Sequence, residues 1–336
     1  MNPTENRNSN LDLIRAIAIV LVLICHFGQH DLLGPVVSPK VVPFGLLGVD
    51  LFFVLSGYLV GSAYFKAERL PGFTPFSFWK IRWARTLPPY YAALILFSIF
   101  DFGKWIHAPG LKLGQFFFIQ NYYENPPGFV VSWSLCIEEH FYLLLPFVGP
   151  FLKSLFGRLP KRIPVLILVL LSPTLFRLLH LKFGIPVGNY GDFKQTHLRY
   201  EGLLFGVLFA HVKARWDLER VLRYRGFLIA FGTLVLFSSI GLTRWLAPLG
   251  SAFGAAVLVC AAIPNDPLAG ARNRIVYWFA TRSYSMYLVH MAAFHFGIGH
   301  DWVRAAITFG MIVVGSEVFF RCVEKPALTL KERLKN

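Results

Sequence analysis

The sequence predicts an all-α protein, a polytopic membrane bundle of about ten transmembrane helices. Hydrophobic residues make up 55% of the 336 residues, and the mean hydropathy is +0.54. Apolar runs of membrane-spanning length also recur along the whole chain. Because these runs are apolar on all sides, they indicate helices and not barrel strands, which alternate apolar and polar residues.

A helix needs about 20 apolar residues to cross the hydrocarbon core of a bilayer. The first such segment is not followed by a cleavage site of small residues, so we expect it to be retained. The sixth segment is short, and Pro88-Pro89 interrupts the third. The whole chain, residues 1–336, is expected to form one integral-membrane domain with no fused soluble domain. The expected spans are 11–28, 44–65, 80–101, 130–152, 162–180, 198–212, 225–242, 245–263, 276–297 and 301–323.

Basic residues indicate how the bundle is oriented in the lipid bilayer. The formal net charge is +15 at pH 7. If the amino terminus lies in the cytoplasm, most of the Lys and Arg residues outside the spans fall in inner loops, as the positive-inside rule requires. We therefore expect both termini in the cytoplasm, and the basic charge requires no nucleic-acid partner.

The first span carries two ionisable residues, Arg15 and His26. Their separation places them on one face, since each residue turns an α-helix by about 100°. An ionisable group in hydrocarbon costs roughly 2.5–3.5 kcal/mol, so such residues usually line a protein or water-filled interior. A fixed cation and a titratable base therefore lie about 16 Å apart along one face, which suggests chemistry that reaches across a membrane.

The second span contains a carboxylate and a hydroxyl, Asp50 and Ser56, together with Gly57 and Gly61. The two glycines form a small-xxx-small pair that lets a neighbouring helix approach closely, so packing alone explains them. A carboxylate at membrane depth needs a partner, and Ser56 can donate a hydrogen bond near the middle of the membrane.

The third span begins with Lys80, Arg82 and Arg85 at the expected cytoplasmic face. One interpretation is topology plus contact with anionic lipid headgroups. The other is a phosphate clamp, because Arg82 and Arg85 share a face and the planar fork of arginine suits bidentate phosphate binding. Pro88-Pro89 is expected to kink the helix beside this cluster.

The fourth span carries two carboxylates near its outer end. Glu138 and Glu139 lie about 100° apart, so we expect that they cannot both face one pocket. Ser134, Glu138 and Tyr142 share a face, and Glu138 falls at a depth similar to that of His26. A carboxylate bonded to a histidine fixes its tautomer and raises its basicity. The alternative is a buried structural glutamate.

The ninth span places Ser283, Tyr287 and His290 on one stripe, which fits a structural polar seam as well as a substrate surface. No zinc-ligand spacing, Walker loop or glycine-rich dinucleotide motif occurs, so we expect no metal site and no nucleotide hydrolysis. Other ionisable residues in the spans, whose pairing the sequence leaves open, are Arg177, Arg199, Glu201 and Glu317.

Taken together and in order, these segments resemble the acyltransferase-3 family of multi-pass bacterial acyltransferases. The resemblance runs from Asn10 to Pro326. Each motif alone is weak, but their combination in the family's order is specific. The motifs are Leu11-Asp12…Arg15…His26, Gly48-Val49-Asp50-Leu51-Phe52-Phe53…Ser56-Gly57, Arg82…Arg85…Pro88, Trp133-Ser134-Leu135…Glu138…Phe141-Tyr142, Ser283-Tyr284…Tyr287-Leu288…His290 and Glu324-Lys325-Pro326.

The resemblance implies an O-acyltransferase of the bacterial inner membrane. Such enzymes move an acyl group, most often acetyl, from cytoplasmic acyl-CoA to a hydroxyl of a sugar or glycan, and the resemblance implies no permanently bound cofactor. His26 and Arg15 match the family's essential pair. Arg82 and Arg85 match its arginine motif, and Glu138 matches its acid. Some members carry a fused extracytoplasmic domain, so here either the membrane domain acts alone or a separate extracytoplasmic protein accepts the acyl group.

The expected mechanism places the phosphates of CoA on Arg82, Arg85 and Lys80. His26 then either deprotonates the acceptor hydroxyl or carries the acyl group transiently. The alternatives are a proton-coupled transporter, which also needs ionisable residues in its spans, and a structural scaffold. The acceptor, the acyl chain and the oligomeric state stay open. The remaining candidate polar positions, either substrate-facing or structural, are Asp50, Ser56, Trp133, Ser134, Tyr287 and His290.

Overall fold

Every regular element in the described part of the chain is a helix. The computed structural model describes residues 7–100, 109–123, 129–185, 193–215, 223–264, 267–268, 270–295 and 301–334. Each of the ten segments expected to span the membrane contains a helix. Residues 101 and 296–297, at the ends of the third and ninth expected spans, lie outside the described residues.

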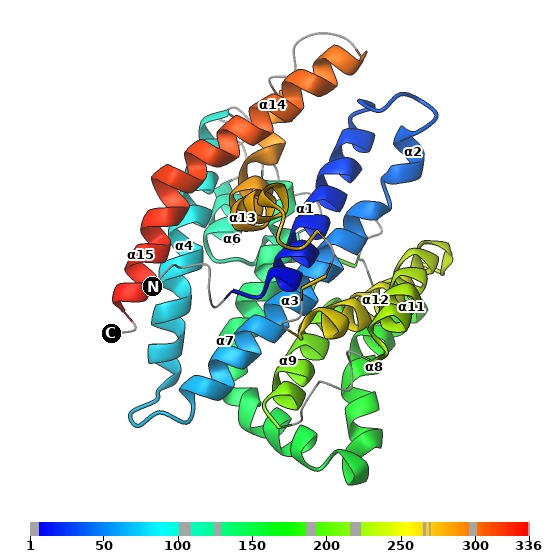
Figure 1. Cartoon of the computed structure of the whole chain (residues 1–336), viewed down its shortest axis with the longest axis vertical. Coiled ribbons are helices and arrows are strands. Elements are labelled where there is room, and N and C mark those ends of the chain that lie inside the picture. Colours follow the sequence, from blue (N-terminus) through cyan, green and yellow to red (C-terminus); the bar gives the residue numbers. More distant parts are fainter. Residues whose placement is uncertain are drawn as a thin grey trace. The chain divides into compact units, whose positions relative to one another are not determined.

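The helices follow the apolar runs of the sequence, with short helical turns between some of them (Figure 1). The helices are α1 (Ser9–Gln29), α2 (Ser38–Val41), α3 (Phe44–Ala67), α4 (Pro75–Phe100), α6 (Pro109–Phe116), α7 (Trp133–Gly157), α8 (Leu159–Phe183), α9 (Glu201–Lys213), α11 (Arg225–Ser238), α12 (Ala247–Ala262), α13 (Arg274–His295), α14 (Asp301–Phe319) and α15 (Lys325–Arg333). The short turns are η1 (Gln120–Tyr122), η2 (Val130–Ser132), η3 (Thr196–Leu198), η4 (Ser239–Gly241) and the π-helical η5 (Phe320–Glu324).

A multi-pass membrane protein is supported by length and hydropathy. Among the described residues, five helical segments are long and apolar enough to cross a bilayer. The other expected spans fall short for two reasons. Helices α9, α11 and α12 contain 13, 14 and 16 residues, whereas about 20 are needed. Helices α4 and α13 are long enough, but polar residues along them make them less apolar than the five segments. The five segments are Ser9–Gln29, Ser38–Ala67, Val130–Gly157, Lys161–Phe183 and Trp302–Arg333.

The chain divides into two compact units. The first comprises Met1–Gln29, Pro35–Ser62 and Glu201–Ser283, and the second comprises His30–Gly34, Ala63–Tyr200 and Tyr284–Asn336. The first contains α1, most of α3, and α9, α11 and α12, whereas the second contains α4, α7, α8, α14, η5 and α15.

Glycines bring the helices of the first unit close together. A methyl group added at Gly57 would collide with the backbone carbonyl of Leu203 on α9, and one at Gly206 would collide with that of Val54 on α3. The close approach at the small-xxx-small pair is therefore confirmed. On the other side of α3, a methyl group at Gly45 would lie 2.5 Å from Cys25 Sγ, so α1 packs tightly beside His26.

Asn8 and Asn10, at the start of α1, also hold the end of α12 and the segment that follows it. The side-chain amide of Asn8 donates to the carbonyls of Ala262 and Ile263, at 3.2 and 2.8 Å. The amide of Asn10, which is fully buried, donates to the carbonyl of Pro264 at 2.7 Å. Its oxygen accepts from the backbone N–H of Leu268 at 2.8 Å. We call these four contacts the amino-terminal latch.

The second unit is organised around α4. This helix packs against α7 on one side and α15 on another, and α4 and α15 lie side by side in Figure 1. The aromatic ring of Tyr90 stacks on Phe118 with the ring centroids 4.2 Å apart, and its hydroxyl donates to the carbonyl of Gln115 at 2.7 Å. These contacts anchor the segment of α6 and η1 to the middle of α4.

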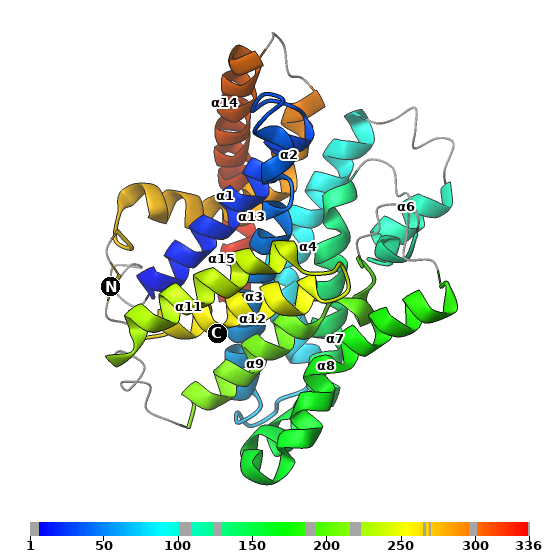
Figure 2. The same cartoon turned by 90° about the vertical axis from the view of Figure 1, so that its right-hand side faces the viewer.

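Two histidines meet at another place in the second unit. His180 on α8 and His197 on η3 are joined by a hydrogen bond of 3.0 Å between their Nε2 atoms. The His197 ring also stacks on Tyr122, with the centroids 5.8 Å apart. Figure 2 shows α7 and α8 beside each other within this unit.

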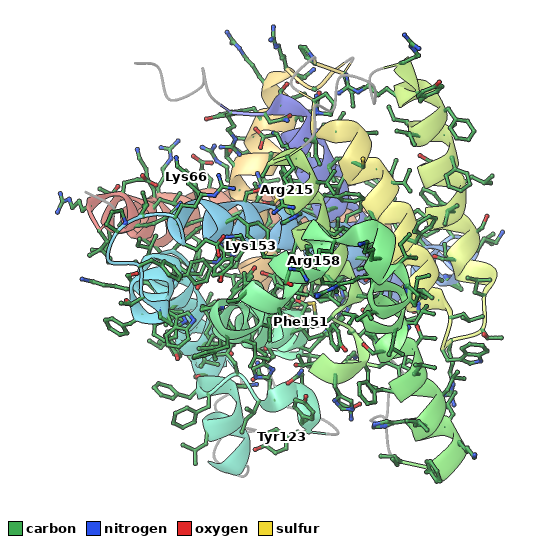
Figure 3. The ribbon with its side chains drawn as sticks, turned by 90° about the horizontal axis from the view of Figure 1, so that it is seen from below. Lys66, Tyr123, Phe151, Lys153, Arg158 and Arg215 are labelled. Carbon is green, nitrogen blue, oxygen red and sulfur yellow. The ribbon has the colours of Figure 1, made fainter. Side chains whose placement is uncertain are left out.

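Lys66 and Lys153 lie in a different part of the second unit from Tyr123 (Figure 3). Lys153 donates to the Glu68 carboxylate at 2.6 Å, which ties the end of α7 to the segment that follows α3.

Candidate active site

A partly buried hydrogen-bonded chain connects α4 and α7 in the second unit. Arg82 donates from Nη2 to the Tyr142 hydroxyl at 2.8 Å, and that hydroxyl donates to Glu138 Oε2 at 2.6 Å. The Arg82 guanidinium carbon also lies 4.2 Å from the centroid of the Tyr142 ring. The predicted shared face of Glu138 and Tyr142 is therefore confirmed, and Tyr142, only 1% exposed, links a cation to a carboxylate.

Glu139 also faces this cluster. The residue is 6% exposed and lies near the side chains of Thr86 and Trp83 on α4. Both Glu138 and Glu139 are close enough to Arg82 to attract its guanidinium. The expectation that the two carboxylates cannot both face one pocket stays a prediction.

Two charged atoms in this cluster are buried without a hydrogen bond. Among the described residues, neither Arg82 Nε nor Glu139 Oε2 has a hydrogen-bond partner. Buried polar atoms of native proteins nearly always have one, and an exception calls for an explanation such as a ligand or a catalytic role. The cluster therefore has a donor and an acceptor available for a bound molecule.

Arg85 lies one turn beyond Arg82 on α4 and is half-buried. Its guanidinium interacts with Glu324, Tyr142 and Tyr284, and it is repelled by Arg82. The common face of Arg82 and Arg85 stays a prediction. Lys80, the third cation of the predicted clamp, is exposed.

Helix α13 closes another side of the cluster. The hydroxyl of Tyr284 donates to the backbone carbonyl of Thr86 at 3.0 Å. Pro88 and Pro89 remain inside the continuous helix α4. The bond from Tyr284 therefore joins α13 to α4 close to these two prolines.

The predicted polar stripe of α13 meets α7. The Tyr287 hydroxyl donates to the carbonyl of Val131 at 2.7 Å. A phenol has a single proton, so the Ser134 hydroxyl must be the donor in its 2.6 Å bond with Tyr287. His290 is fully buried, and its Nδ1 bonds to the carbonyls of Met286 and Tyr287, which makes Nδ1 the protonated nitrogen.

In the first unit, the cation of the Arg15–His26 face is paired. Asp12, which is buried, accepts two hydrogen bonds from Arg7, at 2.6 and 2.8 Å. It accepts a third from Arg15 at 2.9 Å. His26 lies three turns further along α1 and is half-buried. Two arginines on one aspartate leave a net positive charge at the start of α1.

Asp50 finds a different partner from the one considered from the sequence. The Ser251 hydroxyl of α12 donates to its buried carboxylate. Ser56 is half-buried, one and a half turns further along α3.

Trp133, another candidate polar position, is buried at the start of α7. The Arg199 guanidinium lies 5.9 Å from the centroid of its ring.

The ionisable residues whose pairing was open behave differently from one another. Arg177 is fully buried and donates to the carbonyl of Leu198 and to the Thr174 hydroxyl. Glu201 is also buried. Glu317 instead pairs with the exposed Arg321 at 2.6 Å.

The candidate residues fall into two groups. Arg15, His26 and Asp50 belong to the first unit, and Arg82, Arg85 and Glu138 belong to the second. The pairing of His26 with Glu138 stays a prediction. Among the described residues, no group of three or more His, Cys, Asp or Glu side chains is arranged to hold a metal ion.

Sequence reasoning missed several members of these clusters. Asp12 and Glu324 lie inside quoted motifs, and that membership was the available signal. Tyr284 lies beside the predicted stripe of α13, and Glu139 beside the predicted acid. Nothing in the sequence pointed to Ser251, which lies 201 residues from Asp50.

Comparison with known proteins identifies the family. The acyltransferase domain model of the acyltransferase-3 family matches residues 8–320. The O-acetyltransferase OatA of Staphylococcus aureus strain NCTC 8325 is 26% identical over 94% of this chain and 56% of its own length. OatA of strain COL gives the same values. The chain thus spans about half the length of the curated relatives it matches. No solved structure matches it. On the match over nearly its whole length, the chain belongs to the acyltransferase-3 family.

Proposed function

We propose that this protein is a membrane O-acyltransferase that moves an acyl group, most simply acetyl, from cytoplasmic acyl-CoA to a hydroxyl of a cell-surface or exported glycan. The observation that carries the proposal is the partly buried chain from Arg82 through Tyr142 to Glu138, with Arg85 one turn further along α4, in a member of this family. The names of the relatives support O-acetyl transfer.

The proposal includes the full topology. We take the ten helices of the expected spans to cross or enter the bacterial inner membrane, with both termini in the cytoplasm. The separation of Lys66 and Lys153 from Tyr123 supports this orientation (Figure 3). The short helices α9, α11 and α12 then lie partly in protein, where the glycine contacts between α3 and α9 hold the first of them.

The donor is bound in this proposal by the cations of α4. The phosphates of CoA pair with Arg85 and Lys80 and with the part of Arg82 that Tyr142 does not occupy. Arginine supplies paired donors that match phosphate oxygens. The buried Arg82 Nε supports this role, because it has no partner among the described residues.

The acyl group is transferred with His26 as the base. Neutral His26 takes the proton of the acceptor hydroxyl, and the oxygen attacks the thioester carbonyl. The tetrahedral intermediate then expels the CoA thiolate, which takes the proton back from His26. Glu138 orients the imidazole, and Arg15 supplies positive charge on the same face. In the alternative route, His26 itself carries the acyl group transiently before the acceptor hydroxyl receives it.

The acceptor side is formed by the polar groups of α3, α7 and α13 in this proposal. Asp50 and Ser56 lie on the first of these helices, and Trp133, Ser134, Tyr287 and His290 on the other two. Transfer is either direct or through a separate extracytoplasmic protein that accepts the acyl group. The family relationship supports a hydroxyl acceptor, since the relatives are named O-acetyltransferases.

The test is transfer from labelled acetyl-CoA by the purified protein in lipid vesicles. The wild type should consume acetyl-CoA in the presence of glycan acceptors, and His26→Ala should abolish this. His30→Ala is the matched control, because His30 lies just beyond α1 and stacks on Phe294. Full activity in His26→Ala would remove His26 from the mechanism. Proton-coupled solute uptake without consumption of acetyl-CoA would instead identify a transporter.

A further inference from the structure

The junction between α14 and α15 is a π-helical turn. Residues Phe320–Glu324 form this turn, which ends at Glu324. A π-turn inserts one extra residue into a helix, and such turns are rare and frequent at functional sites. The extra residue changes the direction in which the next side chain leaves the helix, and the Glu324 carboxylate is buried, with 3% of the residue exposed.

Glu324 binds two groups of one residue on α13. Its Oε2 accepts from the Ser285 hydroxyl at 2.5 Å and from the Ser285 backbone N–H at 3.2 Å. In a regular helix this N–H bonds to the carbonyl four residues earlier. The carboxylate of Glu324 therefore accepts from the main chain of α13 as well as from the Ser285 side chain. The main-chain bond fixes Glu324 to the helix itself.

The same carboxylate lies in the neighbourhood of Arg85. Tyr284, which precedes Ser285, donates to the carbonyl of Thr86, which follows Arg85. Helix α4 also packs against both the π-turn and α15. At this place the negative charge of Glu324 attracts the Arg85 guanidinium, whereas Arg82 repels it. A buried carboxylate is costly unless it is hydrogen-bonded, and Ser285 meets this condition.

We propose that Glu324 is a positioning residue that holds the Arg85 guanidinium ready for a phosphate group of the acyl donor. The inference rests on the proposed function for the identity of that donor. Glu324 touches no reacting atom. It offsets the repulsion between Arg82 and Arg85, and the π-turn and Ser285 fix the place from which it acts.

The test compares Glu324→Gln with Glu317→Gln. Glu317 lies on the adjoining helix and also pairs with an arginine, but that arginine is 72% exposed, so the control removes a surface pair. Binding of CoA to the purified protein in detergent should weaken about tenfold in Glu324→Gln, which is about 1.4 kcal/mol, and stay unchanged in Glu317→Gln. Pantetheine, which lacks the nucleotide phosphates, should bind Glu324→Gln and the wild type equally.

Further variants separate positioning from folding. Glu324→Asp keeps the charge and should lose only part of the CoA affinity, and it replaces Glu324→Gln if that variant does not fold. In Arg85→Ala, adding Glu324→Gln should cause no further loss. Unchanged CoA affinity in Glu324→Gln, or an equal loss for CoA and pantetheine, would overturn the proposal. Because binding is measured without transfer, CoA binding that depends on Glu324 in a protein that transfers no acyl group would support this inference and refute the proposed function.

Discussion

Replacing Tyr142 by phenylalanine should break the connection between α4 and α7. The substitution removes one oxygen that bonds to Arg82 and to Glu138, at 2.8 and 2.6 Å. Hydrogen bonds to charged groups contribute about 1.5–3 kcal/mol each, so the two together contribute about 3–6 kcal/mol. The phenyl ring keeps the face on which the guanidinium lies, and part of the loss is recovered if the two charges pair directly. We expect a net loss of about 3 kcal/mol.

The assay is thermal unfolding of the purified protein in one detergent at one scan rate. A loss of this size should lower the midpoint by roughly 5 °C. Tyr91→Phe is the matched control, because the Tyr91 hydroxyl donates to a neutral group, the carbonyl of Phe116, at 2.9 Å. That bond contributes about 0.5–1.5 kcal/mol. Equal midpoints for the two variants would refute the idea that Tyr142 links charges inside the protein.

Three further results are expected. Gly57→Ala should sharply reduce the amount of folded protein, because the methyl group collides with Leu203, whereas Gly241→Ala meets nothing within 4 Å and should be harmless; equal yields would refute the close helix contact. Burial, and to a lesser extent His180, lowers the pKa of His197 below 6.5. The contribution of neutral His197 to the stability of the folded protein is therefore complete above about pH 6.5 and is lost as the pH falls toward the folded-state pKa. The melting temperature of His197→Gln should fall less on acidification than that of the wild type, and an identical fall would exclude His197 as the cause. In a variant without native cysteines, an impermeant thiol reagent should label a cysteine at Lys40 in intact spheroplasts, and one at Arg158 only after permeabilisation; the reverse pattern would invert the proposed topology.

The helices were predictable because hydropathy controls where they form. Ten apolar runs became ten helices, with ends that differ by a few residues from those expected. The sequence was a poorer guide to which of these helices are long and apolar enough to cross a bilayer. Helix α4 is long enough but is not apolar enough along its length to count as a span, and α9 is a regular helix of only 13 residues.

The site was predictable where its residues lie close in sequence. Glu138 and Tyr142 are one turn apart, so helical periodicity placed them on one face. The partners of Asp50 and Asp12 depend on tertiary packing and on a choice among many possible donors. The π-turn before Lys325 has no sequence signature that separates it from an ordinary helix, and without it the role of Glu324 could not be read from the motif.

The amino-terminal latch has a consequence for the order in which the protein is made. Asn8 and Asn10 bond to residues that follow them by 254 to 258 positions. The ribosome therefore releases the first helix long before the carbonyls that will satisfy these amides exist. Non-local contacts of this kind form late and slow the acquisition of native structure. Until Leu268 has been synthesised, the amide groups at the start of the chain must remain hydrated or be held by another factor. The latch therefore cannot close before about four fifths of the polypeptide has been made.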